Sequence, residues 1–295
     1  MRNRIGNSAR AAARTAAAAI PFIAFLVLAS VVQAQPPEEK FQRSFNVNPG
    51  STLRVENYKG TIHVTGSKTN QIVVNVFKRF EGSEADRKWW MENVKVNFSN
   101  DSSRVAVEVK YPNVNCMFCW ELHDYTAAVE LDIQVPQKTN VDLDGYKPDI
   151  RVSSLLGDVR IKSYKAPMTI DSTTGAIRID TYKDAIRLKN VAVRGGLEVH
   201  SYKADTEVEA RSLEGSSTLE SDRGRIALRL AGNVGLDVDY SGGRRASFHS
   251  DFPLTAQAGG RLGADVRGTI NQGGSHLRLR TVRGSVSLEK LSGTL

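Results

Sequence analysis

Apolar and polar residues alternate in short segments along most of the chain, as in Val159-Arg160-Ile161-Lys162. Such alternation is typical of a β-strand that has one face in a core and the other in water. The segments form two sets, 159–162, 177–180 and 197–200 in the first and 168–171, 186–189 and 206–209 in the second. Glycines such as Gly157, Gly175 and Gly215 separate them, because glycine turns the chain at low cost. The pattern predicts two short strands in each repeat.

A tripeptide with tyrosine and lysine recurs with the same period as these strands. Its copies are Gly145-Tyr146-Lys147, Ser163-Tyr164-Lys165, Thr181-Tyr182-Lys183 and Ser201-Tyr202-Lys203, at spacings of 18, 18 and 20 residues. A two-strand unit of this size cannot bury its apolar face alone, whereas stacked units share a continuous core. The sequence therefore predicts an all-β fold, a β-solenoid of stacked two-strand coils of about 18–20 residues.

An antiparallel sandwich of hairpins is the alternative fold, since its strands alternate in the same way. A sandwich gives no reason for Tyr-Lys to return at a fixed period, which favours the solenoid. In the solenoid, side chains one period apart, such as Tyr164 and Tyr182, are neighbours. Segments 277–280 and 284–289 are expected to form its last coils.

The N-terminal part of the chain has a less regular pattern. Segments 52–56 and 60–66 already look like coils, and more strands are expected near 72–77, 94–98 and 105–110. Ser83, followed by acids at Glu84 and Asp86, predicts a helix over about 83–93, because a serine N-cap and acidic residues stabilise a helix start. We expect this part to cover the first edge of the solenoid, since open edges recruit other chains.

Residues 1–34 have the pattern of a secretion signal. They contain four arginines and no acid, an apolar run from Ala16 to Val32, and the cleavage-site pattern Val32-Gln33-Ala34. An uncleaved membrane anchor is the alternative, although the run is near the lower limit for a span. No second run of that length follows, so the mature protein is expected not to span a membrane.

The patterns together predict four consecutive parts of the chain. They are a signal peptide at 1–34, a linker at 35–44, an N-terminal β region with the helix and a disulfide loop at 45–126, and the β-solenoid repeat domain at 127–292.

The charge of the whole chain overstates that of the mature protein. The formal net charge is +8, but four of the 40 basic residues lie in the signal, which leaves 36 basic against 32 acidic groups. Both signs are mixed along the rest of the chain, whereas nucleic-acid binding favours a concentrated basic stripe. No nucleic-acid partner is expected, and attraction to anionic envelope polymers stays open.

Cys116 and Cys119 are the two cysteines, in the order Cys-Met-Phe-Cys. In an exported protein, two cysteines so close in sequence predict a disulfide. A thiol–disulfide redox site is the alternative, but such pairs open a helix, and this pair lies in a predicted loop. Covalent haem attachment is excluded because Trp120, not histidine, follows the second cysteine.

The polar positions of the strands give no pattern of a catalytic site. One set reads Lys162, Asp180, His200, Glu220 and the other Asp171, Lys189, Glu209, Arg229. These charges alternate in sign between neighbouring repeats, which pairing across strands explains. The histidines have no metal-ligand spacing, and no nucleophile elbow or phosphate loop occurs. We therefore expect no catalytic residue, metal site or cofactor, and the protein is not predicted to be an enzyme.

Three motifs carry a resemblance to a known family: Leu53-Arg54-Val55 leading to 60–66, then 131–136, and the closing segment 284–288. Over about residues 45–290 they resemble a bacterial family of exported domains called "putative adhesins". The resemblance implies a β-solenoid-like fold and an envelope or surface location, and it supplies no catalytic residues. The cysteine pair and the Tyr-Lys repeat are not part of the family pattern.

The Tyr-Lys repeat is the candidate ligand site. It comprises Tyr146, Lys147, Tyr164, Lys165, Tyr182, Lys183, Tyr202 and Lys203. Residues that share the period of the coils align on one edge, where stacked rings and amines can hold a sugar chain or an anionic polymer. The alternative is structural, in that the rings only cover and stabilise a corner.

The function these patterns predict is that of a non-catalytic, adhesin-like binding or scaffold protein of the cell envelope. It is expected to be exported to the periplasm or surface of a bacterium, with an envelope polysaccharide or envelope protein as its partner. Two alternatives remain open. One is an accessory or sensory partner in an envelope-stress system, and the other is a carbohydrate-active enzyme on a β-helix.

Overall fold

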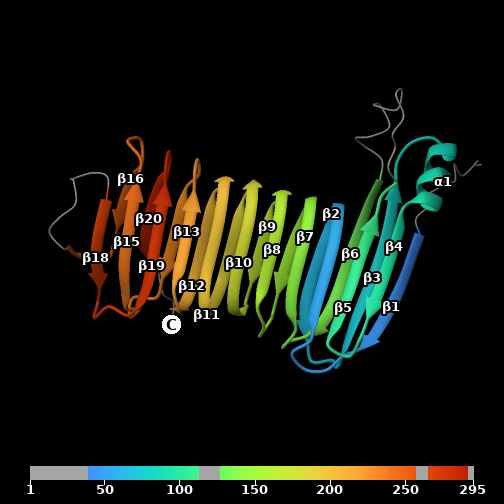
Figure 1. The fold of residues 1–295 in the computed structure, drawn as a ribbon, viewed down its shortest axis with the longest axis horizontal. Helices are drawn as coiled ribbons and strands as arrows, with labels where there is room; N and C mark the ends of the chain where they lie inside the picture. Colours follow the sequence, from blue (N-terminus) through green and yellow to red (C-terminus); the bar gives the residue numbers. More distant parts are fainter. Residues whose placement is uncertain (1–38, 113–126, 257–264, 292–295) are drawn as a thin grey trace, which may run out of the picture. The chain divides into compact units, whose positions relative to one another are not determined.

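The computed structural model describes residues 39–112, 127–256 and 265–291 (Figure 1). Contacts divide the chain into Met1–Gln35 and Pro36–Leu295, and every described residue belongs to the second unit. The predicted signal at 1–34 and the predicted disulfide between Cys116 and Cys119 lie outside the described residues. Among the residues described, no helix has both the length and the apolar character needed to cross a membrane.

The all-β class is confirmed, since the described residues form strands and a single helix. The first strands are β1 (Glu39–Asn46), β2 (Thr52–Ser67), β3 (Gln71–Phe80), β4 (Lys95–Asn100), β5 (Arg104–Lys110), β6 (Ala127–Pro136) and β7 (Asn140–Ser153). The next are β8 (Val159–Lys165), β9 (Met168–Asp171), β10 (Thr174–Lys183), β11 (Ile186–Lys203), β12 (Thr206–Glu214), β13 (Ser217–Ser221) and β14 (Ile226–Leu230). The last are β15 (Leu236–Gly242), β16 (Ser247–Ser250), β17 (Thr255–Ala256), β18 (Asp265–Ile270), β19 (Ser275–Thr281) and β20 (Ser285–Lys290).

The strands of the repeat region pair in parallel with strands one repeat away. β8 lies between β7 and β10, and β10 pairs on its other side with β11. Ile161 is opposite Ile179, which is opposite Val199, and each of these side chains is at most 1% exposed. The sequence period agrees with this strand register, and a slip by one residue would turn the apolar residues into water.

The second set of strands follows the same rule. β9 pairs in parallel with β7 and β11, so that Ile170 lies opposite Val152 and Leu188. The inward residues of both sets belong to one hydrophobic cluster. Each repeat thus contributes two strands to a common core, and its outward residues stay in water.

Residues 45–112 share strand pairings with the repeat region. β2 pairs with β7 along both of its halves, with Leu53 opposite Val141 and Ile62 opposite Ile150. Figure 1 shows β2, in blue, beside the green β7, from which it is distant in sequence. β3 then pairs with β6, β1 with β3, and β4 with β5, all antiparallel.

Helix α1 (Glu84–Asn93) confirms the predicted helix and its start. The Ser83 hydroxyl accepts a hydrogen bond from the Asp86 amide, and the Asp86 carboxylate accepts one from the Ser83 amide. This reciprocal capping satisfies two donors that a helix start leaves open. The helix follows β3 and precedes β4.

The predicted linker at 35–44 is wrong for residues 39–44, which belong to β1. The polar, proline-containing start of this segment concealed two aromatic residues at strand spacing. Phe41 and Phe45 both pack on Phe98 of β4, with ring centroids 6.2 and 5.8 Å apart. The Lys78 ammonium also contacts the Glu39 carboxylate at 2.8 Å. The ring contacts pack β1 on β4, and the ion pair joins β1 to β3.

The predicted order of the last coils is also wrong. β19 and β20 pair directly with β13 and β14, and β15 and β16 pair with the far side of β19 and β20. Figure 1 shows the red β19 and β20 between strands of earlier sequence. β18 returns antiparallel along β15 and makes this order possible. The order cannot be derived from the period, because all these strands alternate alike.

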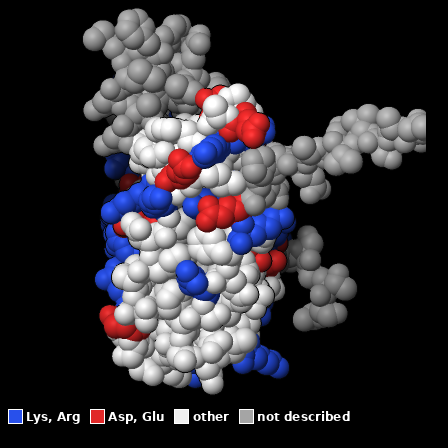
Figure 2. All heavy atoms as spheres, turned by 90° about the vertical axis from the view of Figure 1, so that its right-hand side faces the viewer, with Lys and Arg blue, Asp and Glu red and all other residues white. Residues whose placement is uncertain are grey.

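Charged residues of both signs occupy the side of the protein on which β1, β4 and α1 lie in Figure 1. Figure 2 views this side and shows Lys and Arg interspersed with Asp and Glu over its upper part. β1 and β4 each pair with a single strand among the described residues, which leaves their outer edges open. Charged side chains beside open edges discourage pairing with other chains.

Gly60 lies within β2, at the junction of its two halves, and we expect no other residue to replace it there without loss of stability. Its φ is 122°, and an added Cβ would lie 2.1 Å from the Val129 carbonyl oxygen. Gly60→Ala should therefore lower the free energy of unfolding by more than about 1 kcal/mol in chemical denaturation. Gly232→Ala is the matched control, since a Cβ there meets nothing within 4 Å. Equal stability of the two variants would contradict the parallel packing of β2 on β6.

Candidate functional site

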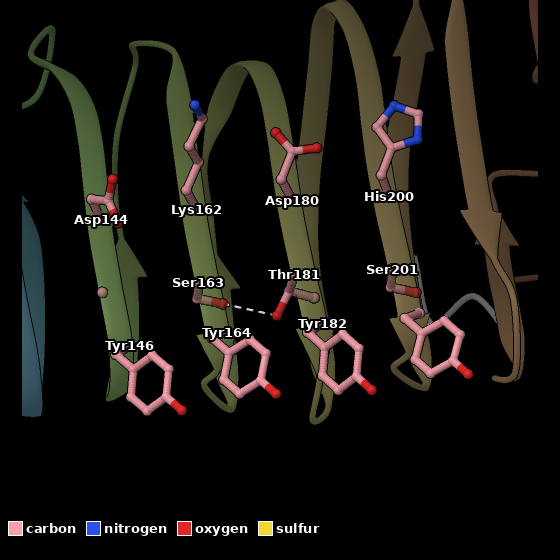
Figure 3. Close-up of a pocket in the computed structure, with 12 residues that line it drawn as sticks. Asp144, Tyr146, Lys162, Ser163, Tyr164, Asp180, Thr181, Tyr182, His200 and Ser201 are labelled. Atoms are coloured by element: carbon pink, nitrogen blue, oxygen red, sulfur yellow. Dashed lines mark hydrogen bonds between the residues drawn. The ribbon is translucent and has the colours of Figure 1, made fainter.

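A groove of about 780 Å³ crosses the outer faces of β7, β8, β10 and β11 (Figure 3). Each strand contributes a charged or histidine side chain, then a small residue, then a tyrosine. In parallel strands in register, residues of one kind align across neighbouring strands. The groove is therefore built from three rows, which run perpendicular to the strands.

The tyrosines form a continuous stack along one side of the groove. Tyr146, Tyr164, Tyr182 and Tyr202 follow one another with ring centroids 4.8, 4.8 and 4.9 Å apart and interplanar angles of 9°, 11° and 17°. This distance is the spacing of paired strands, so the backbone register itself stacks the rings. The structure thus brings together all four tyrosines that the sequence proposed as a ligand ladder.

Tyr58 extends the stack by one ring, which sequence reasoning missed. Its ring lies 4.8 Å from that of Tyr146 at an interplanar angle of 5°. The signal was present in Asn57-Tyr58-Lys59, which repeats the tripeptide in a distant part of the chain. Only the parallel pairing of β2 with β7 places this copy next to Tyr146. We call Tyr58, Tyr146, Tyr164, Tyr182 and Tyr202 the tyrosine row.

The two ends of the tyrosine row are closed by different groups. Beyond Tyr58 lies Tyr111, at 5.9 Å between ring centroids, and its hydroxyl donates a hydrogen bond to the Lys59 carbonyl. Burial raises the pKa of the Tyr111 hydroxyl. Beyond Tyr202 lies the Arg223 guanidinium, 5.3 Å from the ring centroid.

Ring stacking leaves the edges and hydroxyl groups of the tyrosines open to a ligand. The inner rings have a neighbouring ring on both sides, yet Tyr164 and Tyr182 remain 36% and 38% exposed. Figure 3 shows the hydroxyls of Tyr146, Tyr164 and Tyr182 pointing the same way. A ligand therefore meets a line of phenol groups repeated at the strand spacing, rather than one free aromatic face.

Lysines of the Tyr-Lys repeat lie beside the rings. The ammonium groups of Lys147, Lys165 and Lys203 are 5.5, 5.2 and 5.4 Å from the centroids of the tyrosines that precede them. Lys183 is in register with Lys165 and Lys203. An ammonium at this distance from a ring is attracted by its electrons. The amines thus stay at the tyrosine row, where an anionic ligand can reach them.

Small residues form the floor of the groove, at Gly145, Ser163, Thr181 and Ser201. The hydroxyls of Ser163 and Thr181 are hydrogen-bonded at 2.8 Å, as Figure 3 shows. A small side chain at these positions leaves space between the tyrosine row and the charged side chains opposite. Ser163 and Ser201 are half-buried and Thr181 is buried, so the floor offers a polar ligand the hydroxyls of Ser163 and Ser201.

The opposite side of the groove carries Asp144, Lys162, Asp180 and His200, which are exposed and in register. The His200 ring nitrogen Nδ1 lies 3.5 Å from the carboxylate of Glu220. In the part of the chain that the structure describes, Asp144, Lys162 and Asp180 form no ion pair. We call Asp144, Lys162, Asp180 and His200 the charged row.

The second set of outward charges, on the other strands of the repeat, pairs more closely. Arg229 contacts Glu209 at 3.0 Å and Glu289 at 3.1 Å. The hydrogen bond that Arg229 donates to the Glu289 carboxylate raises the pKa of Arg229, and hydrogen bonds from the Ser287 hydroxyl and from Arg229 lower the pKa of Glu289. The alternating signs predicted ion pairs between neighbouring strands. Such pairs are found in this second set, at Arg229, and are fewer in the charged row.

Tyr240 does not join the tyrosine row, although it lies 38 residues, or about two repeats, after Tyr202. It is in register with Leu279 of β19 and is 1% exposed. Its ring stacks on Phe248 at 4.7 Å. Tyr240 thus occupies a core position, which shows that the presence of a tyrosine does not by itself identify a member of the tyrosine row. Burial raises the pKa of its hydroxyl.

Comparisons with known proteins give only distant similarities. No family model matches the chain, and no curated protein matches it. Within the described residues, no group of three or more His, Cys, Asp and Glu side chains is placed to hold a metal ion.

Several solved structures are similar to the chain. One is a putative cell adhesion protein from Clostridium sporogenes, 9% identical, with 86% of this chain and 100% of that chain covered and a TM-score of 0.38. A second is a putative adhesin from Bacteroides fragilis, 10% identical, with 87% and 99% covered and a TM-score of 0.29. A third is a putative lipid binding protein from Parabacteroides distasonis, 7% identical, with 86% and 97% covered and a TM-score of 0.22. Proteins named as putative adhesins, the family that the sequence resembles, are thus among the structures to which this chain is similar.

Proposed function

We propose that the protein is a non-catalytic binding protein of the bacterial cell envelope, and that it holds an extended polysaccharide in the groove along the tyrosine row. The observation that carries the proposal is the stack of tyrosines on one side of a groove about 780 Å³ in volume. Those residues are spread from Tyr58 to Tyr202 along the chain. Their alignment on one exposed line is more than a corner needs for stability.

The chemistry of the groove suits a polyhydroxylated ligand. Sugars make hydrogen bonds in several directions, and the groove offers phenol hydroxyls, the hydroxyls of Ser163 and Ser201, and the charged row. Ring edges add apolar contact to the carbon faces of a sugar. Because each row repeats at the strand spacing, the groove fits a polymer that lies across the strands better than a compact molecule.

The finer description of the fold is part of the proposal. We infer a β-solenoid over residues 127–292, extended at one side by the N-terminal β region at 45–126. The parallel registers of β7, β8, β10 and β11 support this description. Like the extended concave surfaces of other repeat proteins, such a stack presents equivalent side chains along a line.

Export is proposed from the sequence. The arginine-rich start, apolar run and cleavage pattern of residues 1–34 support it, with Cys116 and Cys119 as a structural disulfide in an oxidising compartment. Periplasm and cell surface are both compatible with these features. An envelope polymer is then within reach of the groove.

Retention by isolated envelope polysaccharide tests the proposed function. The mature protein, beginning at Gln35, is expected to be retarded in native gels cast with polysaccharide from a bacterial envelope. Bovine serum albumin in the same gels controls for non-specific retardation. Migration unchanged by every envelope fraction would contradict the proposal.

A further inference from the structure

A second line of side chains runs beside the tyrosine row, and all of its members are basic. Lys59 is in register with Lys147, and Lys165 with Lys183 and Lys203. The line continues past the last tyrosine. The Arg223 amide donates a hydrogen bond to the Tyr202 carbonyl, and the Arg283 amide donates one to the Asp222 carbonyl, so these arginines follow Lys203 in the strand order. We call Lys59, Lys147, Lys165, Lys183, Lys203, Arg223 and Arg283 the basic row.

Uniform positive charge along neighbouring strands costs folding free energy. Like charges directly opposite one another repel, whereas opposite charges attract. Elsewhere the outward lines mix signs, as in Arg178 opposite Glu198 at 3.3 Å or Arg229 between Glu209 and Glu289. The four lysines of the Tyr-Lys repeat therefore differ from these lines of mixed sign, and the rings beside three of them offset part of their repulsion.

Among the residues that the structure describes, the four lysines of the Tyr-Lys repeat, Lys147, Lys165, Lys183 and Lys203, form no ion pair. The Asp149 carboxylate contacts Arg151 at 3.3 Å, and the Asp205 carboxylate accepts a hydrogen bond from the Arg225 amide. Asp222 forms an ion pair with Arg223 at 3.7 Å and so neutralises part of the charge at that end of the row, and Asp184 follows Lys183 directly in the sequence. Arg244 and Arg245 add two exposed cations in the turn after Gly243, whose amide bonds to the Thr281 carbonyl beside Val282.

We propose that the polymer held along the tyrosine row is an acidic polysaccharide, whose carboxylate or other anionic groups contact the basic row. This inference rests on the proposed function and specifies the charge of its ligand. A linear polyanion places many charges along one line, as the basic row does, and its binding removes the repulsion between the lysines. The basic row extends to Arg223 and Arg283, beyond the last tyrosine. We therefore infer that the ligand's charges contact the protein over a longer distance than its contacts with the tyrosine rings.

The tyrosine row and the hydroxyl floor favour a polysaccharide over a nucleic acid. A duplex would present phosphates to the amines but would leave the floor and the phenol edges without partners. An export signal also places the protein away from most nucleic acid. Competition by duplex DNA is therefore one arm of the test.

Two polymers with one backbone and different charge test the inference. Carboxymethyl cellulose is anionic and hydroxyethyl cellulose is neutral, and both are β-linked glucans. In affinity electrophoresis the mature protein should bind the anionic polymer more tightly by roughly tenfold or more, and added salt should reduce this difference. Lys165→Gln with Lys183→Gln should weaken binding of the anionic polymer by roughly tenfold and leave the neutral polymer unaffected.

A charge-matched control separates the row from net charge. Arg187→Gln with Lys189→Gln removes two exposed cations from β11 outside the groove, and it should leave binding unchanged. The lysine variant should also unfold no more readily than the parent, because it relieves repulsion. Lower stability of the lysine variant would indicate a structural row and overturn the inference.

The remaining outcomes are distinct. Equal binding of the two polymers would overturn the inference and leave the proposed function standing. Equal loss with the control variant would show that only net charge acts, and would also overturn it. Displacement of carboxymethyl cellulose by duplex DNA at equal charge concentration would overturn the choice of polysaccharide. Retention of neither polymer would overturn the inference, whereas the gels cast with envelope polysaccharide decide the proposed function separately.

Discussion

Ile179→Asp is expected to abolish the cooperative unfolding transition of the protein. Ile179 is 1% exposed and lies opposite Ile161 on one side and Val199 on the other. A carboxylate at that position has no partner, and an unpaired buried charge costs about 3–5 kcal/mol. Loss of the apolar contacts adds to that, against a typical total stability of about 5–15 kcal/mol. Circular dichroism during urea denaturation measures the loss.

The neighbouring residue supplies the control for this prediction. Asp180 belongs to the same strand but points outward into the groove, so Asp180→Ala should change the free energy of unfolding by less than about 0.5 kcal/mol. If Ile179→Asp were as stable as Asp180→Ala, the inward and outward faces of β10 would be reversed. The assignment of inward and outward residues in this strand would then be wrong.

Tyr164→Ala combined with Tyr182→Ala is expected to weaken polysaccharide binding more than about tenfold while the protein stays folded. The two rings are adjacent in the middle of the tyrosine row, 4.8 Å apart, so their removal interrupts the line of phenol groups. Central aromatic contacts carry a large share of binding energy in other interfaces. Both rings lie outside the hydrophobic core, which explains why folding should persist. Affinity electrophoresis and circular dichroism give the two readouts.

Two further variants make the tyrosine prediction specific. Trp89→Ala removes another exposed aromatic side chain, 41% exposed on α1, and should leave binding unchanged. Tyr164→Phe with Tyr182→Phe keeps the stack and removes the hydroxyls, and it should lose part of the binding because the hydroxyl edge faces the ligand. Unchanged binding in the double alanine variant would leave the tyrosine row as a purely structural feature.

The repeat region could be predicted from sequence in unusual detail because one period governs it. Alternation identifies the inward residues, and the spacing of Tyr-Lys identifies which residues become neighbours. Ser163 and Thr181, 18 residues apart, are hydrogen-bonded at 2.8 Å as the period requires. The register leaves no other choice, since a slip by one residue would turn the apolar face into water.

Positions outside the period could not be derived in this way. Tyr58 joins the row only through the pairing of β2 with β7, which links residues 88 apart. β19 and β20 are inserted beside β13 and β14, so that Arg229 contacts Glu289, 60 residues away. Strand alternation is the same for every order of these strands, and contacts made by loops and by β18 decide between the orders.

The candidate site was predicted in its residues but not in its extent. The sequence named the tyrosines and lysines of the repeat and aligned them on one edge, but it gave no sign of the groove they border. It also did not place Lys59 or Arg283 in line with these lysines, as the register does. Clustering of charge across a parallel sheet becomes visible only when the strands are aligned.

Methyl-to-methyl nuclear Overhauser effects between Ile161 and Ile179 test whether residues one repeat apart are neighbours in parallel strands. The core and the tyrosine row both depend on this arrangement. With isoleucine methyl groups labelled, we expect a strong cross-peak between these two residues, which lie opposite each other and are buried. Absence of that cross-peak in the folded protein would contradict the stacking of the repeats and remove the proposed groove.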